Sequence, residues 1–147
     1  MITNISIVSV WVKDIDESLA FYTDVLGFVA KDDIQLGPDF RWCTVCHPSQ
    51  PELQVHLTTP SKPLSDELID AMVRAQSQGG LPGIGLQVDD CRATYEELVA
   101  KGVEFLQTPE ERPYGVEALM RDNSGNWMVL VEPRAYSPED FEGTDLG

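Results

Sequence analysis

Two short strings in this chain match motifs of known chemistry. The first fits the CxxCH pattern at which c-type haem is attached, and it comprises residues Cys43 to His47. It falls within a strand pattern, Phe40 to His47, that sends the two cysteines to opposite faces, and no export signal for cytochrome maturation precedes it. We therefore interpret Cys43 and Cys46 as buried strand cysteines.

The second string is rich in glycine and runs from Gly80 to Gly85. It precedes a predicted strand and does not open a helix, so it lacks the context that a phosphate-binding loop requires. We interpret its glycines as the end of the preceding helix and as a place where backbone or ligand approaches the sheet closely.

His56 offers acid–base chemistry near neutral pH. It lies in a predicted strand, Leu53 to Thr59, on the face turned towards a hollow of the predicted fold. Three roles are open for it: ligand contact, general base, or a structural histidine hydrogen-bonded to a neighbour. No nucleophile next to it can be recognised in the sequence.

Aromatic residues are predicted to line the same hollow. Trp11 shares the inward face of the first strand with Ile7 and Ser9, and Trp127 faces inward on the last strand. Inward tryptophans suit stacking against a planar ligand, although they can also simply fill the hollow. The opposite face of the first strand should pack under a helix, and it comprises Val8, Val10 and Val12. The polar contacts that would orient a ligand are expected from Gln54, Gln87, Arg41 and Tyr114, although alternation does not determine the face of Arg41.

An internal repeat determines which elements position these residues. Val12 to Phe28 and Val88 to Phe105 follow the same plan: each leaves a strand, meets an aspartate, runs through an amphipathic helix and ends at a glycine before the next strand. The aspartates are expected to cap the helices and the glycines to stop them, and these residues are Asp14, Asp90, Gly27 and Gly102.

The repeat predicts an α+β fold of two βαβββ units, which form an open, concave, eight-stranded mixed sheet with helices on its outer face. The expected strands are Ile5–Lys13, Phe28–Asp33, Phe40–His47, Leu53–Thr59, Gly83–Val88, Val103–Gln107, Tyr114–Arg121 and Trp127–Glu132. The expected helices are Ile15–Leu26, one from Ser65 (as cap) to Gln78, and Cys91–Lys101. Asp122 to Asn126 is a turn by composition.

We expect one domain over residues 1–133, with repeat one at 4–59, a linker helix at 60–80 and repeat two at 81–133. An acidic C-terminal tail, residues 134–147, follows it. A chain of 147 residues with 42% hydrophobic content can bury a core without metals or disulfides.

The composition also restricts the partners. A formal net charge of −15 repels nucleic acid and anionic membranes and attracts cations, although it also serves solubility. No apolar run is long enough to span a membrane, no signal peptide opens the chain, and the three cysteines are an odd number. We expect a cytoplasmic protein with neither nucleic-acid nor membrane partners.

The chain resembles the vicinal oxygen chelate superfamily, which includes glyoxalase I, extradiol dioxygenases, and fosfomycin- and bleomycin-resistance proteins. The resemblance covers Ile5 to Pro133 and rests on the segments Val12–Asp14, Ser18–Tyr22, Leu26–Phe28, Val88–Asp90, Gly102–Val103, Pro113–Gly115 and Asp122–Asn126. It implies the predicted fold and a homodimer, because family members are commonly dimers in which the concave cup of the sheet is shared with, or completed by, the partner subunit.

The resemblance also implies four ligand positions for a metal, and these fall at Ile7, His56, Gly83 and Val129. Only His56 has a side chain that can coordinate, whereas a catalytic divalent site needs about three protein ligands. Shifting the register by one residue would turn the side chains to the helix-packed face. We therefore interpret the metal site as absent and expect no cofactor.

These arguments favour a metal-free protein that binds a small molecule in its concave cup without chemistry, similar to the bleomycin-resistance branch and its role in antibiotic resistance. The acidic balance favours a cationic, aromatic ligand. No catalytic residue is assigned, and the predicted ligand-binding residues are Ser9, Trp11, Arg41, Gln54, His56, Gln87, Tyr114 and Trp127. The alternative is an enzyme of the same superfamily, of lyase, isomerase or dioxygenase type, with a non-standard site around His56. A purely structural or regulatory module has no positive support.

The sequence generates a first prediction, which concerns metal. Because Ile7, Gly83 and Val129 have no coordinating side chain, the purified protein should hold no stoichiometric nickel, zinc, iron or manganese when analysed by mass spectrometry of the elements. Glyoxalase activity on a hemithioacetal should stay undetectable after metal is added. A tightly bound metal that is lost in His56→Ala would contradict this interpretation.

Overall fold

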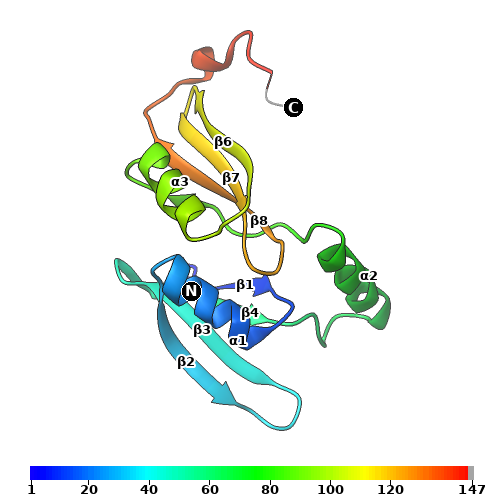
Figure 1. The fold of residues 1–147 in the computed structure, drawn as a ribbon. Helices are drawn as coiled ribbons and strands as arrows, with labels where there is room; N and C mark the ends of the chain where they lie inside the picture. Colours follow the sequence, from blue (N-terminus) through cyan, green and yellow to red (C-terminus); the bar gives the residue numbers. More distant parts are fainter. Residues whose placement is uncertain (146–147) are drawn as a thin grey trace. The chain divides into compact units, whose positions relative to one another are not determined.

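The computed structural model describes residues 1–145 (Figure 1). In chain order its elements are β1 (Ile7–Trp11), α1 (Ile15–Ala20), the π-helical turn η1 (Phe21–Val25), β2 (Val29–Gln35), β3 (Arg41–His47), β4 (Gln50–Thr58), α2 (Asp66–Ser77), β5 (Leu86–Gln87), α3 (Cys91–Ala100), β6 (Phe105–Arg112), β7 (Gly115–Arg121), β8 (Trp127–Pro133) and the 3-10 turn η2 (Pro138–Phe141).

The eight strands form two four-stranded sheets, with the orders β1-β4-β3-β2 and β5-β8-β7-β6. In each sheet the first strand of the repeat runs parallel to the last, and the later strands of the repeat pair antiparallel. Helix α1 packs on the first sheet and α3 on the second (Figure 1). The α+β class with two βαβββ repeats is therefore confirmed.

The chain divides into two compact units. One comprises residues 1–83 together with 122–127, and the other comprises 84–121 and 128 onwards. The turn that precedes β8 thus belongs to the unit of the first repeat. No helix within residues 1–145 is long and apolar enough to cross a membrane.

The predicted helix signals are confirmed. The side chains of Asp14, Ser65 and Asp90 accept hydrogen bonds from the backbone N–H groups of the first helical turns of α1, α2 and α3. Gly27 and Gly102 follow their helices with φ values of 80° and 87°, in the left-handed region where glycine is favoured.

The alternation predicted for β1 is also confirmed. Val10 and Val12 are buried, with 2% and 0% exposure, whereas Ile7 on the other face is 45% exposed. Val8, also predicted to be buried, is only half-buried. The two cysteines of the CxxCH string are buried in β3, as predicted.

Four elements differ most from the prediction. The strand expected over Val103–Gln107 begins at Phe105 and runs on to Arg112. The first helix is α-helical only to Ala20 and continues as the π-helical turn η1. The strand expected over Gly83–Val88 is reduced to Leu86–Gln87, because Pro82 lacks a backbone donor and the glycines favour irregular backbone. The tail includes a 3-10 turn, Pro138–Phe141, capped by Ser137, while residues 146–147 of the predicted tail lie outside the described residues.

The turn from Asp122 to Asn126 is buried and polar. Oδ1 of Asp122 accepts hydrogen bonds from the backbone N–H groups of Ser124 and Asn126, at 2.9 and 3.0 Å. Its Oδ2 accepts from the Tyr22 hydroxyl at 2.8 Å and from the Asn126 amide at 3.1 Å. Asp122 is 5% exposed, so four donors depend on one buried carboxylate.

The same turn holds β1 and the segment after α2. The Asn126 amide donates to the carbonyl of Trp11 at 2.7 Å, and its Oδ1 accepts from the Leu81 N–H at 3.0 Å. A Cβ at Gly80 would lie 2.0 Å from the Gly125 carbonyl oxygen, so only glycine allows this close backbone approach.

The Asp122 cluster leads to a second prediction. Asp122→Ala would leave four donors without their acceptor, and each buried unpaired polar group costs about 1–3 kcal/mol. We expect the free energy of unfolding, measured by urea denaturation, to fall by at least about 4 kcal/mol, which is the lower end of the cost for four donors. The control, Asp89→Ala at an exposed loop position, should change it by less than about 0.5 kcal/mol. Equal losses in the two variants would show that the cluster does not stabilise the fold.

Candidate ligand-binding surfaces

Strand register gathers several predicted residues on one face of the first sheet. His56 of β4 lies opposite Ser9 of β1 on one side and opposite Thr44 of β3 on the other. Ile7 pairs with Gln54 and Trp11 with Thr58, two positions before and after the Ser9–His56 pair, so these side chains share that face. We call it the His56 face.

His56 is packed between aromatic rings. Its imidazole lies 4.4 Å from the Trp42 ring, measured between centroids, with an interplanar angle of 36°. The Phe40 ring meets it edge-on, at 6.0 Å and 67°. His56 is only 7% exposed, and burial lowers its pKa, although a hydrogen bond between its ring and the backbone of Arg41 opposes this shift. Burial therefore favours the uncharged imidazole.

The Nε2 atom of His56 is buried and has no hydrogen-bond partner among residues 1–145. Neighbouring polar groups on the same face are paired with one another. The Thr44 hydroxyl bonds to Oε1 of Gln54 at 2.8 Å and accepts from the Asp32 N–H at 3.1 Å. The Trp42 indole N–H donates to Asp32 at 3.2 Å. These pairs leave Nε2 as a buried nitrogen without a hydrogen-bond partner on this face among the described residues.

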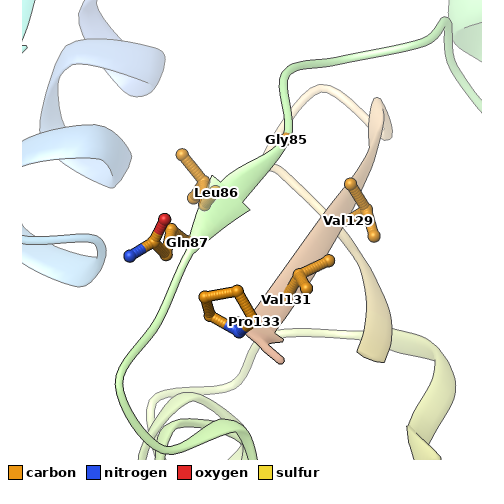
Figure 2. Close-up of a pocket in the computed structure, with 6 residues that line it drawn as sticks. All are labelled: Gly85, Leu86, Gln87, Val129, Val131 and Pro133. Atoms are coloured by element: carbon orange, nitrogen blue, oxygen red, sulfur yellow. The ribbon is translucent and has the colours of Figure 1, made fainter. Parts of the chain in front are cut away.

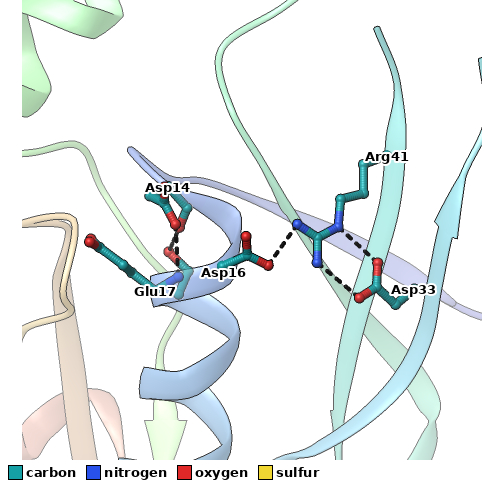
Figure 3. Close-up of polar contacts among 6 residues, drawn as sticks. Asp14, Asp16, Glu17, Asp33 and Arg41 are labelled. Carbon is teal, nitrogen blue, oxygen red and sulfur yellow. Dashed lines mark hydrogen bonds and ion pairs between the residues drawn. The ribbon is translucent and has the colours of Figure 1, made fainter. Parts of the chain in front are cut away.

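Arg41 is not brought to this face. In β3 it lies beside Gln35 and one residue from Trp42, so it projects to the opposite side of the sheet, towards α1. Figure 3 shows its guanidinium between Asp33, with bonds of 2.8 and 2.9 Å, and Asp16 at 2.9 Å. Hydrogen bonding to Arg41 lowers the pKa of Asp33. The predicted ligand contact is thus replaced by ion pairs that connect α1 to the β2–β3 hairpin.

The two predicted tryptophans differ in their surroundings. Trp11 is half-buried at the end of β1, where its carbonyl accepts from Asn126. Trp127 is 44% exposed, and its backbone pairs with Leu81 and Gly83. Both rings retain exposed surface on which a ligand can stack.

The second unit has a separate apolar groove between β5 and β8, with a volume of about 230 Å³ (Figure 2). Gln87 contributes its amide, and the other lining residues are Gly85, Leu86, Val129, Val131 and Pro133. A Cβ at Gly85 would lie 3.0 Å from a methyl group of Val129, so glycine keeps this groove open.

Tyr114 does not line that groove. Its hydroxyl donates to Glu117, and burial together with this hydrogen bond raises its pKa to about 12. Its ring stacks on Phe141 of the tail at 6.2 Å, with an interplanar angle of 18°. The hydroxyl that we predicted to orient a ligand is thus already engaged within the chain.

Sequence reasoning missed Trp42, Phe40 and Thr44. Alternation could have placed Trp42 and Thr44 on one face of β3, but all residues from Cys43 to Cys46 are buried, so hydrophobicity does not reveal which face that is. The pairing of Thr44 with His56 reveals it, and that pairing is a property of the folded sheet.

The residues at the superfamily's metal positions do not fit a metal. The side chains of Ile7 and Val129 are hydrocarbon, and Gly83 has none. Among residues 1–145 no three His, Cys, Asp or Glu side chains gather in a way that could hold an ion. We derive no reaction step through a metal.

Comparison with known proteins establishes the family. The chain belongs to the Glyoxalase/Bleomycin resistance protein/Dioxygenase superfamily, whose family model matches residues 4–130. The uncharacterized protein YurT of Bacillus subtilis is 30% identical over 128 residues, which cover 87% of this chain and 98% of YurT.

Two solved structures are similar in both sequence and fold. The crystal structure of UcmS2 is 38% identical with a TM-score of 0.81, and the match covers 90% of this chain and 99% of UcmS2. TnmS3, an antibiotic binding protein from Streptomyces sp. CB03234, is 27% identical with a TM-score of 0.70, and the match covers 90% of this chain and 98% of TnmS3.

The buried imidazole gives a third prediction. Because burial lowers the pKa of His56, the unfolded chain binds its proton more readily, and the free energy of unfolding should fall as pH decreases below the ordinary histidine pKa of about 6.5. His56→Phe should reduce this dependence, by at most about 1.4 kcal/mol per pH unit, in urea denaturation between about pH 7.5 and 5. His47→Gln, which removes an exposed imidazole, is the matched control. An unchanged slope in His56→Phe would contradict the assignment.

Proposed function

We propose that this protein binds a small planar organic molecule on the His56 face and performs no chemistry on it. The observation that carries the proposal is the aromatic group around His56: Trp42 and Phe40 contact its ring, while its Nε2 has no partner in the described chain. Aromatic surface with few, well-defined polar positions is typical of small-molecule sites.

The family supports this proposal. Its description includes resistance proteins, and TnmS3, with the same fold, is an antibiotic binding protein. We therefore propose an antibiotic-like ligand, held without metal, and a role in resistance by sequestration. Ser9, Trp11, Gln54 and His56 are the proposed contacts from the first unit, together with Trp127. The groove beside Gln87 is a second candidate surface.

The charge of the chain supports a cationic ligand. A net charge of −15 raises the local concentration of cations near the surface and speeds their association at low ionic strength. A homodimer, a cytoplasmic location and a single domain over residues 1–133 remain proposals of the same kind.

One observation favours the enzyme alternative. A neutral, buried imidazole with an open nitrogen has the properties of a general base. No nucleophile or second acid–base group is hydrogen-bonded to that nitrogen within residues 1–145, so a binding role accounts for the site with fewer assumptions. Recovery of the bound compound unchanged after prolonged incubation separates binding from turnover.

The fourth prediction tests the binding role with daunorubicin, a planar cationic antibiotic, through quenching of tryptophan fluorescence. Because an aromatic contact contributes about 1 kcal/mol beyond its buried area, Trp11→Ala and Trp127→Ala should each weaken binding by about fivefold. Tyr136→Ala, at a 61% exposed position of the tail, is the control and should bind as wild type does. Association should slow as ionic strength rises.

The outcomes separate the parts of the proposal. Association that does not depend on salt would contradict the electrostatic part of the proposal but not the aromatic binding surface. Equal affinity in wild type and both tryptophan variants would contradict the proposal that the ligand binds to this aromatic surface.

A further inference from the structure

We propose that Nε2 of His56 is the hydrogen-bonding position for a hydroxyl group carried by a planar aromatic ligand. This inference rests on the proposed binding function and deepens it, because it names the functional group that the ligand must present. It comes from one buried atom and the groups packed around it.

The Nε2 atom of His56 is buried and unpaired within residues 1–145. His56 is 7% exposed, and Nε2 has neither solvent nor a hydrogen-bond partner in the described part of the chain. Buried polar atoms in folded proteins are nearly always paired, so an unpaired one calls for an external partner. The nearby acceptors and donors, on Asp32, Thr44 and Gln54, already bond to one another or to Trp42.

Aromatic rings surround the imidazole of His56. The imidazole lies against the Trp42 ring, at 4.4 Å between centroids, so a group bonded to Nε2 lies next to aromatic surface. Phe40 meets the imidazole edge-on and is 40% exposed, so a ligand that approaches the imidazole from solvent on this side would take the place of the Phe40 contact. A planar ring that replaces the Phe40 contact would meet the same aromatic environment.

The ligand group that pairs with Nε2 must match the hydrogen bonding of an imidazole nitrogen. A neutral imidazole nitrogen either accepts or donates one hydrogen bond, depending on its tautomer, and a hydroxyl can complement both. A carboxylate is disfavoured, because an uncharged ring offers it no counter-charge and the chain already has a net charge of −15. A hydroxyl on an aromatic ring satisfies the nitrogen without burying a charge.

The experiment compares three probes of similar size: 2-naphthol, 2-methoxynaphthalene and naphthalene. Dissociation constants are measured by tryptophan fluorescence for wild type, His56→Phe and the control His47→Phe. We expect wild type to bind 2-naphthol about tenfold more tightly than naphthalene, as one buried hydrogen bond implies. In His56→Phe this preference should disappear while naphthalene affinity stays within about twofold, and His47→Phe should behave as wild type.

A second measurement does not depend on a variant. In ¹⁵N-labelled wild type the Nε2 resonance of His56 should shift on addition of 2-naphthol and stay unchanged on addition of naphthalene. If 2-methoxynaphthalene, which can only accept, binds as tightly as 2-naphthol, then Nε2 carries the hydrogen and the hydroxyl acts as acceptor. If it binds like naphthalene, the hydroxyl is the donor.

Three results would overturn the inference. The same preference for 2-naphthol in His56→Phe and wild type would place the hydroxyl elsewhere. An Nε2 resonance unaffected by bound 2-naphthol would show that the nitrogen has a structural partner such as water. Equal binding of all three probes by wild type would remove the hydrogen bond but leave the aromatic surface. Binding of none of them would overturn the inference together with the proposed aromatic surface.

Discussion

The carboxylate of Asp122 is the interaction on which the first unit depends. It accepts four hydrogen bonds while almost fully buried, and the turn that it organises reaches β1 through Asn126 and helix η1 through Tyr22. The π-helical turn η1 includes Tyr22, and the hydroxyl of Tyr22 donates its hydrogen bond to the buried carboxylate of Asp122. The cluster thus adds a contact at the end of β1, which is also paired with β4 along its length.

The two faces of the first sheet carry different side chains and different contacts. The face towards α1 contains the buried side chain of Val10 and the ion pairs of Arg41, which bring helix and hairpin together. The opposite face contains His56, Trp42 and Gln54, and it has polar atoms arranged in a short network. Because side chains alternate along a strand, residues of the two faces are interleaved, and the consecutive residues Arg41 and Trp42 lie on opposite faces.

The residues at the positions that the resemblance implies for metal ligands do not fit a divalent ion. At three of the four metal positions the chain has Ile7, Gly83 and Val129, none of which coordinates. The remaining position, His56, is instead packed against Trp42 and kept neutral by burial. The aromatic rings beside His56 and its buried nitrogen, unpaired within the described chain, are the basis for proposing binding without catalysis.

The sequence by itself determined the repeat, the caps at Asp14, Ser65 and Asp90, the glycine stops and the inward face of β1, because these depend on neighbours within one or two helical turns or on alternation along one strand. Only the tertiary structure decided that Arg41 faces α1, that Trp42 stacks on His56, that Tyr114 bonds to Glu117 and that four donors converge on Asp122. Strand β3 is buried on both faces, so its periodicity is uninformative, and its register against β4 is set by contacts between segments distant in sequence.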